Sequence, residues 1–519
     1  MRRALNVLNT GALQLLCSVL CIGALAPVDL SASSCCGAVD YNGKTLGSMC
    51  GSNCCVPEYD PGPLPQPLTL EKAEKFALRH NKTLRSLRWA VVSGAWKRCD
   101  ARSKFAPKLS LEATITRSDF RAENPSTSIK EKLTVDQIIY DTASYYGVCA
   151  ADLDARQLEI SLLSLTNNIL FDVRSAYYEM IVSEEELQVQ EENVQILGDA
   201  LRREERKYEV GESTKFDVRQ SKVAVANALS SYYRSVRNYK VAQNTLLTAL
   251  GLEPNDDVQL VIEERDIPVM AVPLLRAKAE SLGWTEGRTE EEKNDLVAET
   301  FRVYSQDDAS RDRIFSEADI WLWEQRAMDA RPAIKRSCVN LMKARNTLNS
   351  RYGERHPKIT FSATGTNNAG SSFHIHKKFM EGEFGGKLTW CLFDAGRHFR
   401  IRSARSERCD AMVKYEEEVQ QTKRVIADSF HDLEGALLSY FAATQSVILA
   451  EEAIELAANR RDLGVITPLE YRDVANSLTT ARQQFNRASF TLMRSYYSLR
   501  REAGVDVEDN ACMLLGCYG

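Results

Sequence analysis

Apolar and polar side chains alternate at every second position in several stretches of the chain. In PKLSLEATIT (107–116) the leucines and isoleucine alternate with serine, glutamate and threonine. This period is typical of a β-strand with one apolar face. About ten residues suffice for such a strand to cross an outer membrane, although a soluble hairpin pair packed on a helix has the same pattern. Four strands are predicted, over residues 107–117, 129–141, 357–367 and 382–394.

A second period, close to that of a helix, fills most of the remaining chain. Two very long helices are predicted over residues 143–209 and 396–462, each roughly 100 Å long at ~1.5 Å per residue. Shorter helices over 214–250 and 467–503 are expected to return along them. The acidic stretch 183–193 is most simply a solvated face. In the first long helix, apolar residues recur at the steps of a coiled-coil seam: Leu158, Leu162, Leu165, Ile169, Ala176, Met180, Leu187, Val194, Leu197 and Leu201.

The order of these elements occurs twice, so the chain is expected to be internally duplicated. Residues 107–116 match 357–366 at five of ten positions with an offset of 250, and IIYD (138–141) matches CLFD (391–394) with an offset of 253. Each half therefore reads as helix, strand, strand, very long helix, turn, helix. The opening helices are predicted over 68–106 and 317–352. Pro332 lies inside the second of them and predicts a break there.

The turn after each long helix is the most regular part of the repeat. A glycine suits the left-handed residue that ends a helix, and Thr followed three residues later by Asp or Glu has the spacing of a capping box. Pro468 fits the first helical position. The stretch GESTK (211–215) lacks the second glycine and the Gly-Lys-Ser/Thr ending of a phosphate-binding loop. Both turns are predicted to be tight hairpin tips, built from Gly211, Thr214 and Asp217 and from Gly464, Thr467 and Glu470.

Composition limits the class of protein. The 519 residues carry a formal charge of −5 with a pI near 5.9, which argues against a nucleic-acid partner. Mean hydropathy is −0.32, and after the N-terminus no run of 18 or more apolar residues predicts a transmembrane helix. A membrane role must therefore use strands.

The N-terminus has the pattern of an export signal. Arg2 and Arg3 precede the apolar stretch 11–26, so residues 1–34 are interpreted as a signal peptide. Lipidation of Cys35 and simple cleavage after Ala32 or Ser34 remain alternatives. Residues 35–67 form a cysteine-rich and proline-rich tail, for which disulfides or cross-links are favoured over zinc because spaced cysteine pairs and histidines are missing.

The rest of the chain divides accordingly. The first repeat spans 68–253 and the second 320–506. Between them, residues 254–319 have no counterpart and are interpreted as a charged insertion beside the helices, with a helix near 289–304. Residues 507–519 form a C-terminal tail with Cys512 and Cys517.

These features resemble the TolC-type outer-membrane efflux and secretion channels over about residues 68–506. LTLEKAEKFALRHN at the start of the first repeat, LTWCLFDAGR (388–397) and the two Gly-x-x-Thr-x-x-Asp/Glu tips carry the resemblance. It implies a mainly α protein whose duplicated helical hairpins form a coiled-coil α-barrel. Four strands from each chain would form a twelve-stranded outer-membrane β-barrel in a homotrimer. A periplasmic adaptor protein and an inner-membrane transporter would dock at the tips, in the periplasm of a Gram-negative-type bacterium.

The resemblance also implies where the pore narrows. Acidic residues after the second turn ring the closed entrance of relatives, and by motif position these are Glu470 and Asp473; a charge pair and cap at a helix N-terminus is the structural alternative. Relatives close the entrance with an aromatic residue before the second glycine and an arginine after it. This chain has Arg461 and Ile466 at those places, so a different network is expected, such as Arg461 with Asp217.

No catalytic chemistry is predicted. The sequence has no Gly-x-Ser-x-Gly motif and no spaced Cys/His cluster, so neither an enzyme nor a cofactor is expected. His374 and His376 are most simply part of a polar loop. The main hypothesis is an export duct of a tripartite efflux or type I secretion system, and the alternative is a structural or adhesive coiled-coil protein of the periplasm or surface.

Overall fold

The computed structural model describes residues 67–117, 127–254, 274–277, 315–369, 380–462 and 465–506. The predicted signal peptide, both tails, most of the insertion with its helix near 289–304, and His374 and His376 lie outside these residues. The described residues all belong to one compact unit, Tyr59–Asn510.

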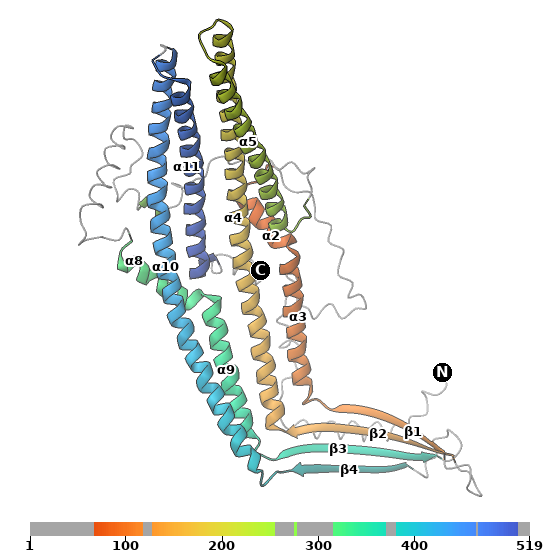
Figure 1. The fold of residues 1–519 in the computed structure, drawn as a ribbon. Helices are drawn as coiled ribbons and strands as arrows, with labels where there is room; N and C mark the ends of the chain where they lie inside the picture. Colours follow the sequence, from red (N-terminus) through yellow and green to blue (C-terminus); the bar gives the residue numbers. More distant parts are fainter. Residues whose placement is uncertain are drawn as a thin grey trace. The chain divides into compact units, whose positions relative to one another are not determined.

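Helices dominate this unit (Figure 1). The first half contains α2 (Leu70–His80), α3 (Lys82–Ser103), α4 (Thr142–Glu209) and α5 (Lys215–Leu250). The second contains α8 (Glu317–Ala330), α9 (Pro332–Gly353), α10 (Ala395–Asp462) and α11 (Pro468–Ala503). The long helices α4 and α10 have 68 residues each, and α5 and α11 have 36 each. The predicted duplication into two long hairpins is therefore confirmed at the level of the helices.

The four predicted strands form one antiparallel sheet in the order β1-β2-β3-β4. They are β1 (Lys108–Arg117), β2 (Thr127–Tyr140), β3 (Lys358–Ala369) and β4 (Met380–Thr389). Each half contributes one hairpin, and β2 joins β3 across the repeat, with Asp136 opposite Ser362. The strand predicted over 382–394 ends at Thr389, which pairs with Lys358 at the start of β3. The next residue, Trp390, donates its indole N–H to the carbonyl of Arg355, 2.9 Å away.

The register of the sheet separates apolar from polar side chains. Residues directly opposite each other on antiparallel strands point to the same face. One face therefore carries an apolar row across all four strands, and the next row, on the opposite face, is polar. The apolar row is Leu109, Val135, Ala363 and Phe384; the polar row is Ser110, Thr134, Thr364 and Glu383.

Both faces of this sheet lack cover from the rest of the described chain. The edge strands β1 and β4 are exposed along their described side chains, and Leu111 and Phe384 are 74% and 81% exposed. A sheet with an uncovered apolar row on one face and two unpaired edges is not stable in water by itself. Within the described part of the chain, nothing completes the sheet.

A break divides each opening helix. The predicted break at Pro332 is confirmed: the residue before a proline is pushed out of the helical region, and Arg331 has ψ 122°. In the first half, the single helix predicted over 68–106 is wrong. Asn81 (ψ 118°) ends α2, and its side chain accepts hydrogen bonds from the N–H groups of Thr83 and Leu84 to start α3.

Each break is packed against the glycine that ends the hairpin of the same half. Gly251 and Gly504 have φ +85° and +73° and close α5 and α11. A Cβ on Gly251 would lie 2.9 Å from the Cα of Asn81, and a Cβ on Gly504 would lie 3.1 Å from the nitrogen of Arg331. Only glycine accepts both this conformation and this approach.

The hydrophobic core lies where α2 and α8 meet the long helices. It is one cluster that includes Tyr177, Leu246, Phe430 and Leu492, all with at most 1% exposure. A polar network lies beside it. Arg174 donates to Glu74 at 2.5 Å and to Asp506 at 2.8 Å, and Arg500 lies 2.9 Å from Asp506. The network joins α2 and α4 to the end of α11.

One prediction about the first long helix needs correction. The acidic stretch 183–193 is not wholly a solvated face, because Glu186, Gln190 and Asn193 are buried where α11 covers α4.

Among the described helices, one segment, Ala395–Arg461, is apolar and long enough to cross a membrane by length and composition. It packs on α8, α9 and α11, so this single segment is weak support for a transmembrane helix.

Candidate functional site: the hairpin tips and the seam between the hairpins

The first tip, the turn between α4 and α5, has the geometry predicted for it. Gly211 has φ +84°, and the N–H of Glu212 bonds to the carbonyl of Lys207 at 2.8 Å, which satisfies the end of α4. Thr214 and Asp217 then form a complete capping box. The hydroxyl of Thr214 lies 2.6 Å from Oδ2 of Asp217.

The second tip, between α10 and α11, repeats this geometry. The N–H of Val465 bonds to the carbonyl of Arg460 at 2.9 Å, equivalent to the bond in the first tip. Thr467 and Glu470 form the capping box, and Pro468 begins the helix. Gly464 lies outside the described residues, so its predicted conformation stays a prediction. The tips lie at the same end of the bundle, opposite the sheet (Figure 1).

The two acidic residues predicted to line the pore have different partners. The backbone N–H of Thr467 donates to Glu470 at 2.8 Å, and this bond, with the contact to the Thr467 hydroxyl, lowers the pKa of Glu470. Glu470 is therefore ionised and held by the cap. Asp473 has a 63% exposed side chain, 3.4 Å from Arg472. Both residues are exposed, but the carboxylate of Asp473 takes no part in the helix cap.

A contact that the sequence analysis missed crosses the second tip. The guanidinium of Arg461, in the last turn of α10, lies 3.7 Å from the ring centroid of Tyr471 in α11. A cation this close to an aromatic face is attracted to it. The expected partner, Asp217, caps its own helix instead. Arg461 therefore contacts an aromatic ring across the tip, whereas a contact with Asp217 was predicted.

A polar seam joins the two hairpins where α4 meets α11. Arg482 donates to Glu192 at 2.6 Å, and Arg487 donates to Glu186 at 2.9 Å. Buried Asn193 has a side-chain oxygen that accepts no hydrogen bond from the described residues. The seam therefore joins the two hairpins through ion pairs between α4 and α11.

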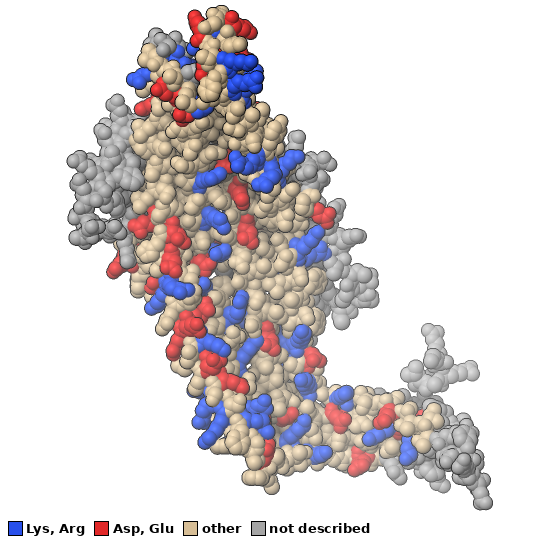
Figure 2. All heavy atoms as spheres, in the orientation of Figure 1, with Lys and Arg blue, Asp and Glu red and all other residues tan. Residues whose placement is uncertain are grey.

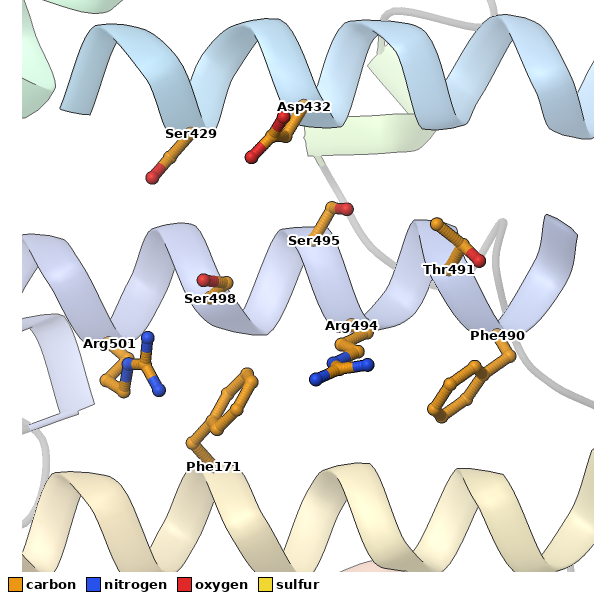
Figure 3. A pocket seen from close by; sticks show the side chains of 9 residues that line it. All are labelled: Phe171, Ser429, Asp432, Phe490, Thr491, Arg494, Ser495, Ser498 and Arg501. Atoms are coloured by element: carbon orange, nitrogen blue, oxygen red, sulfur yellow. The ribbon is translucent and has the colours of Figure 1, made fainter. Parts of the chain in front are cut away.

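Closer to the core, the seam opens into a small cavity of about 290 Å³ (Figure 3). Arg494 and Arg501 extend from α11 toward α4, and the guanidinium of Arg501 lies 4.3 Å from the ring centroid of Phe171. Burial raises the pKa of the nearby Asp172, although the charge of Arg501 opposes the shift. Asp432 and four hydroxyl groups complete the polar lining; the hydroxyls belong to Ser429, Thr491, Ser495 and Ser498.

At the opposite end, an ion network fixes the junction between the sheet and the helices. Arg351 and Arg400 both contact Glu354, at 2.8 and 3.0 Å, and Arg400 also pairs with Asp394. Partial burial tends to raise the pKa of Glu354, but the two arginines outweigh it and lower the pKa. The end of α9 is thereby tied to the start of α10.

Within the described residues, no group of three or more His, Cys, Asp or Glu side chains is placed to hold a metal ion. The polar groups at the tips serve as helix caps, ion pairs and exposed charges.

Comparison with known proteins gives the family. Two segments, residues 75–252 and 323–505, match the family model described as outer membrane efflux protein. The chain belongs to the outer membrane efflux protein family. The matched segments lie within the two predicted repeats and leave out both predicted tails and the whole predicted insertion, residues 254–319. The family places the protein in the outer membrane.

Solved structures of efflux-family channels have the same fold. The Campylobacter jejuni outer-membrane channel CmeC is similar with a TM-score of 0.66 and 14% identity, over 84% of this chain and 85% of that one. The Neisseria gonorrhoeae channel MtrE, in its open state, is similar with a TM-score of 0.64 and 16% identity, over 84% and 88%. At these identities the likeness concerns the fold.

A curated relative is the outer membrane efflux protein BepC of Brucella suis. It is 22% identical over 188 residues, which is 36% of this chain. The aligned region spans 41% of the length of BepC. The activity, cargo and partners of the whole protein are therefore matters for proposal.

Proposed function

We propose that this protein is the outer-membrane duct of a tripartite efflux or type I secretion system. Three copies would join their sheets into one twelve-stranded barrel and their hairpins into a tunnel that reaches into the periplasm. Small molecules or proteins would pass through it. A periplasmic adaptor protein would dock at the tips and link the tunnel to an inner-membrane transporter.

The sheet is the observation that carries this proposal. A row of apolar side chains runs across all four strands, yet both faces and both edges lack partners within the described chain. Closure of three such sheets would pair the edges and turn this apolar row toward lipid. A structural or adhesive coiled-coil protein would need the long helices but not a sheet of this kind.

Reconstitution tests the proposal. Purified protein from outer-membrane extracts should migrate as a heat-modifiable trimer and should conduct ions in planar lipid bilayers. A protein that fractionates as soluble and gives no conductance would contradict the duct hypothesis and favour the coiled-coil alternative.

The entrance of the duct would lie at the tips. Three copies of Asp473, with Glu470 in the cap beside it, would concentrate negative charge there and favour cations. Gly211, Thr214, Asp217, Gly464 and Thr467 would set the shape that the adaptor contacts.

The contact between Arg461 and Tyr471 would help hold the entrance closed. Substitution of Tyr471 by Ala removes the ring and should increase the open-channel fraction in bilayers. Tyr471→Phe keeps an aromatic face and should behave nearly as the unsubstituted protein does. Equal behaviour of the two variants would show that the ring has no part in closure.

A further inference from the structure

The cavity beside α11 has guanidinium groups and aromatic rings next to each other. Arg494 and Arg501 extend from α11 toward α4, and the rings of Phe171 and Phe490 lie beside them (Figure 3). Phe171 is only 9% exposed, so packing fixes its ring, and the guanidinium of Arg501 lies 4.3 Å from the ring centroid. The cavity therefore combines positive charge with flat apolar surface.

The two arginines differ in their partners. Arg501 pairs with Glu502 at 2.9 Å and has the carboxylate of Asp172 nearby, so its charge is largely balanced. No described residue forms an ion pair or a side-chain hydrogen bond with Arg494. Charged groups of both signs are interspersed along the long helices on the face that Figure 2 shows, so an arginine without a counter-ion is not explained by a lack of acids. Arg494 is the group of the cavity that is available to an anion.

The carboxylate that lines the cavity lies apart from the guanidinium groups. Asp432 belongs to α10, and Figure 3 shows it on the opposite side of α11 from Arg494. A negative group beside Arg494 would thus have α11 between itself and Asp432. The hydroxyls of Thr491 and Ser498, which also line the cavity, are able to donate hydrogen bonds to an anion.

We infer that this cavity binds a small organic anion that carries an aromatic ring, such as an aryl sulfonate or an aryl carboxylate. The anionic group would accept hydrogen bonds from Arg494, whose planar fork matches two oxygens at once. The ring would pack against Phe171 and Phe490 in an offset or edge-to-face arrangement. The volume of about 290 Å³ suffices for one or two rings, since a cavity of about 150 Å³ holds benzene.

The position of the cavity along α11 relates it to the tunnel. Arg494 and Arg501 follow Asp473 by three and four heptads, and Arg487 lies one heptad before Arg494. Side chains at heptad spacing share one face of a helix in a coiled coil. Asp473 is proposed to line the pore, so the cavity would open on the inner wall of the tunnel. This placement rests on the proposed duct, whereas the binding site itself does not.

The acidic entrance and this site would act separately. Arg494 lies about 30 Å from Asp473 along the helix, at ~1.5 Å per residue. Charges in solvent are screened over about 8 Å at physiological ionic strength. The carboxylate at the tip therefore does not cancel the charge of the arginine, and the duct is expected to hold aromatic organic anions beyond its entrance.

The first half of the chain lacks an equivalent site. At the offset of 253, Val241 and Thr248 stand where the second half has its two arginines, and Arg237 stands where it has Phe490. The duplicated fold is therefore not sufficient for the cavity chemistry, which belongs to α11. Arg237, exposed on α5, gives a matched control for removal of one positive charge.

Binding of naphthalene-1-sulfonate to the purified full-length protein in detergent tests the site. Fluorescence titration should show saturable binding of one molecule per chain. Arg494→Gln should weaken it about tenfold or more, because a charge-assisted hydrogen bond is lost. Phe171→Leu keeps an apolar side chain without the ring and should weaken it about threefold. Arg237→Gln should leave it unchanged.

Two competitors test the chemistry of the ligand. Naphthalen-1-ylmethylammonium has the same rings and a positive charge, and it should not displace the sulfonate. Inorganic sulfate lacks the rings and should displace it only weakly. Displacement by the ammonium compound, no loss of affinity in Arg494→Gln, or equal losses in Arg494→Gln and Arg237→Gln overturns the anion site. Displacement by sulfate as strong as by naphthalene-1-sulfonate itself overturns recognition of the ring.

Channel recordings separate the site from the duct. In planar bilayers, naphthalene-1-sulfonate should reduce the current of the unsubstituted protein, and Arg494→Gln should raise the half-blocking concentration by the same factor as the binding constant. Binding without block in a conducting channel overturns the placement on the tunnel wall. Absence of conductance in the unsubstituted protein overturns the proposed duct, while the titration in detergent still decides whether the site exists.

Discussion

Arg174 on α4 donates a hydrogen bond to Asp506, 2.8 Å away and 332 residues later in the chain. The two side chains are 8% and 2% exposed. Burial by itself would lower the pKa of Arg174, but the carboxylates of Glu74 and Asp506 outweigh it and raise the pKa above its ordinary value. The arginine stays charged and depends on these partners.

Removal of the Asp506 carboxylate should therefore be costly. Asp506→Ala leaves a buried guanidinium with part of its partners missing, which should destabilise the helical part by about 3–5 kcal/mol. The control is Glu253→Ala, at the equivalent position of the first repeat, where the Lys82–Glu253 pair is largely exposed. That change should stay within about 0.5 kcal/mol. Unfolding in detergent, followed by circular dichroism, measures both; similar losses would contradict the assigned role of the buried pair.

Alanine at either hairpin-closing glycine should also destabilise the fold. Gly251→Ala and Gly504→Ala meet both a positive φ and a close backbone neighbour, so each should cost more than about 1 kcal/mol. Gly198, inside α4, has no atom within 4 Å of an added Cβ. Gly198→Ala should instead stabilise the helix by up to about 1 kcal/mol. Thermal unfolding of the three variants checks the difference in sign.

Acid should weaken the junction between the sheet and the helices. The pKa of Glu354 is lower in the folded chain than its ordinary value of about 4.3. Because the folded-state pKa is the lower one, the ion pairs contribute fully to stability above about pH 4.3. This contribution is lost as the pH falls through the folded-state pKa of Glu354. Glu354→Gln should reduce stability at pH 7 and flatten its dependence on pH below about 4.3. An unchanged pH profile would show that Glu354 does not couple protonation to stability.

Cation selectivity should depend on the second tip more than on the first. Asp473 has its counterpart at Gln220, which has no charge. Asp473→Ala should shift the reversal potential toward lower cation selectivity in bilayers with a salt gradient, and Gln220→Ala should leave it nearly unchanged. Equal shifts of the reversal potential in the two variants would contradict a larger role of the second tip in cation selectivity.

Local signals predicted the elements well. Alternation located all four strands, and the tip motifs located the ends of α4, α5, α10 and α11 to within a few residues. These signals are local because period, glycine and capping residues act on neighbouring backbone. Pro332 likewise predicted its break, whereas Asn81 gave no comparable warning, since asparagine also occurs inside helices.

Tertiary contacts were harder to predict. The burial of Glu186 depends on Arg487 of another hairpin, and the contact of Arg461 with Tyr471 depends on how two helix ends approach each other. Acidic residues on a helix are usually solvated, so the sequence favoured the wrong environment for part of 183–193. Such pairs become visible only when distant segments are brought together.

The two helix breaks show how the duplicated halves can diverge. One bend is made by an asparagine that caps the next helix, and the other by an arginine before a proline. Nevertheless, an equivalent glycine packs against each bend, Gly251 in the first half and Gly504 in the second. The two halves thus share the path of the backbone, whereas different side chains produce the bend. Alignments of such repeats are therefore better anchored on the closing glycines than on the residues at the bends.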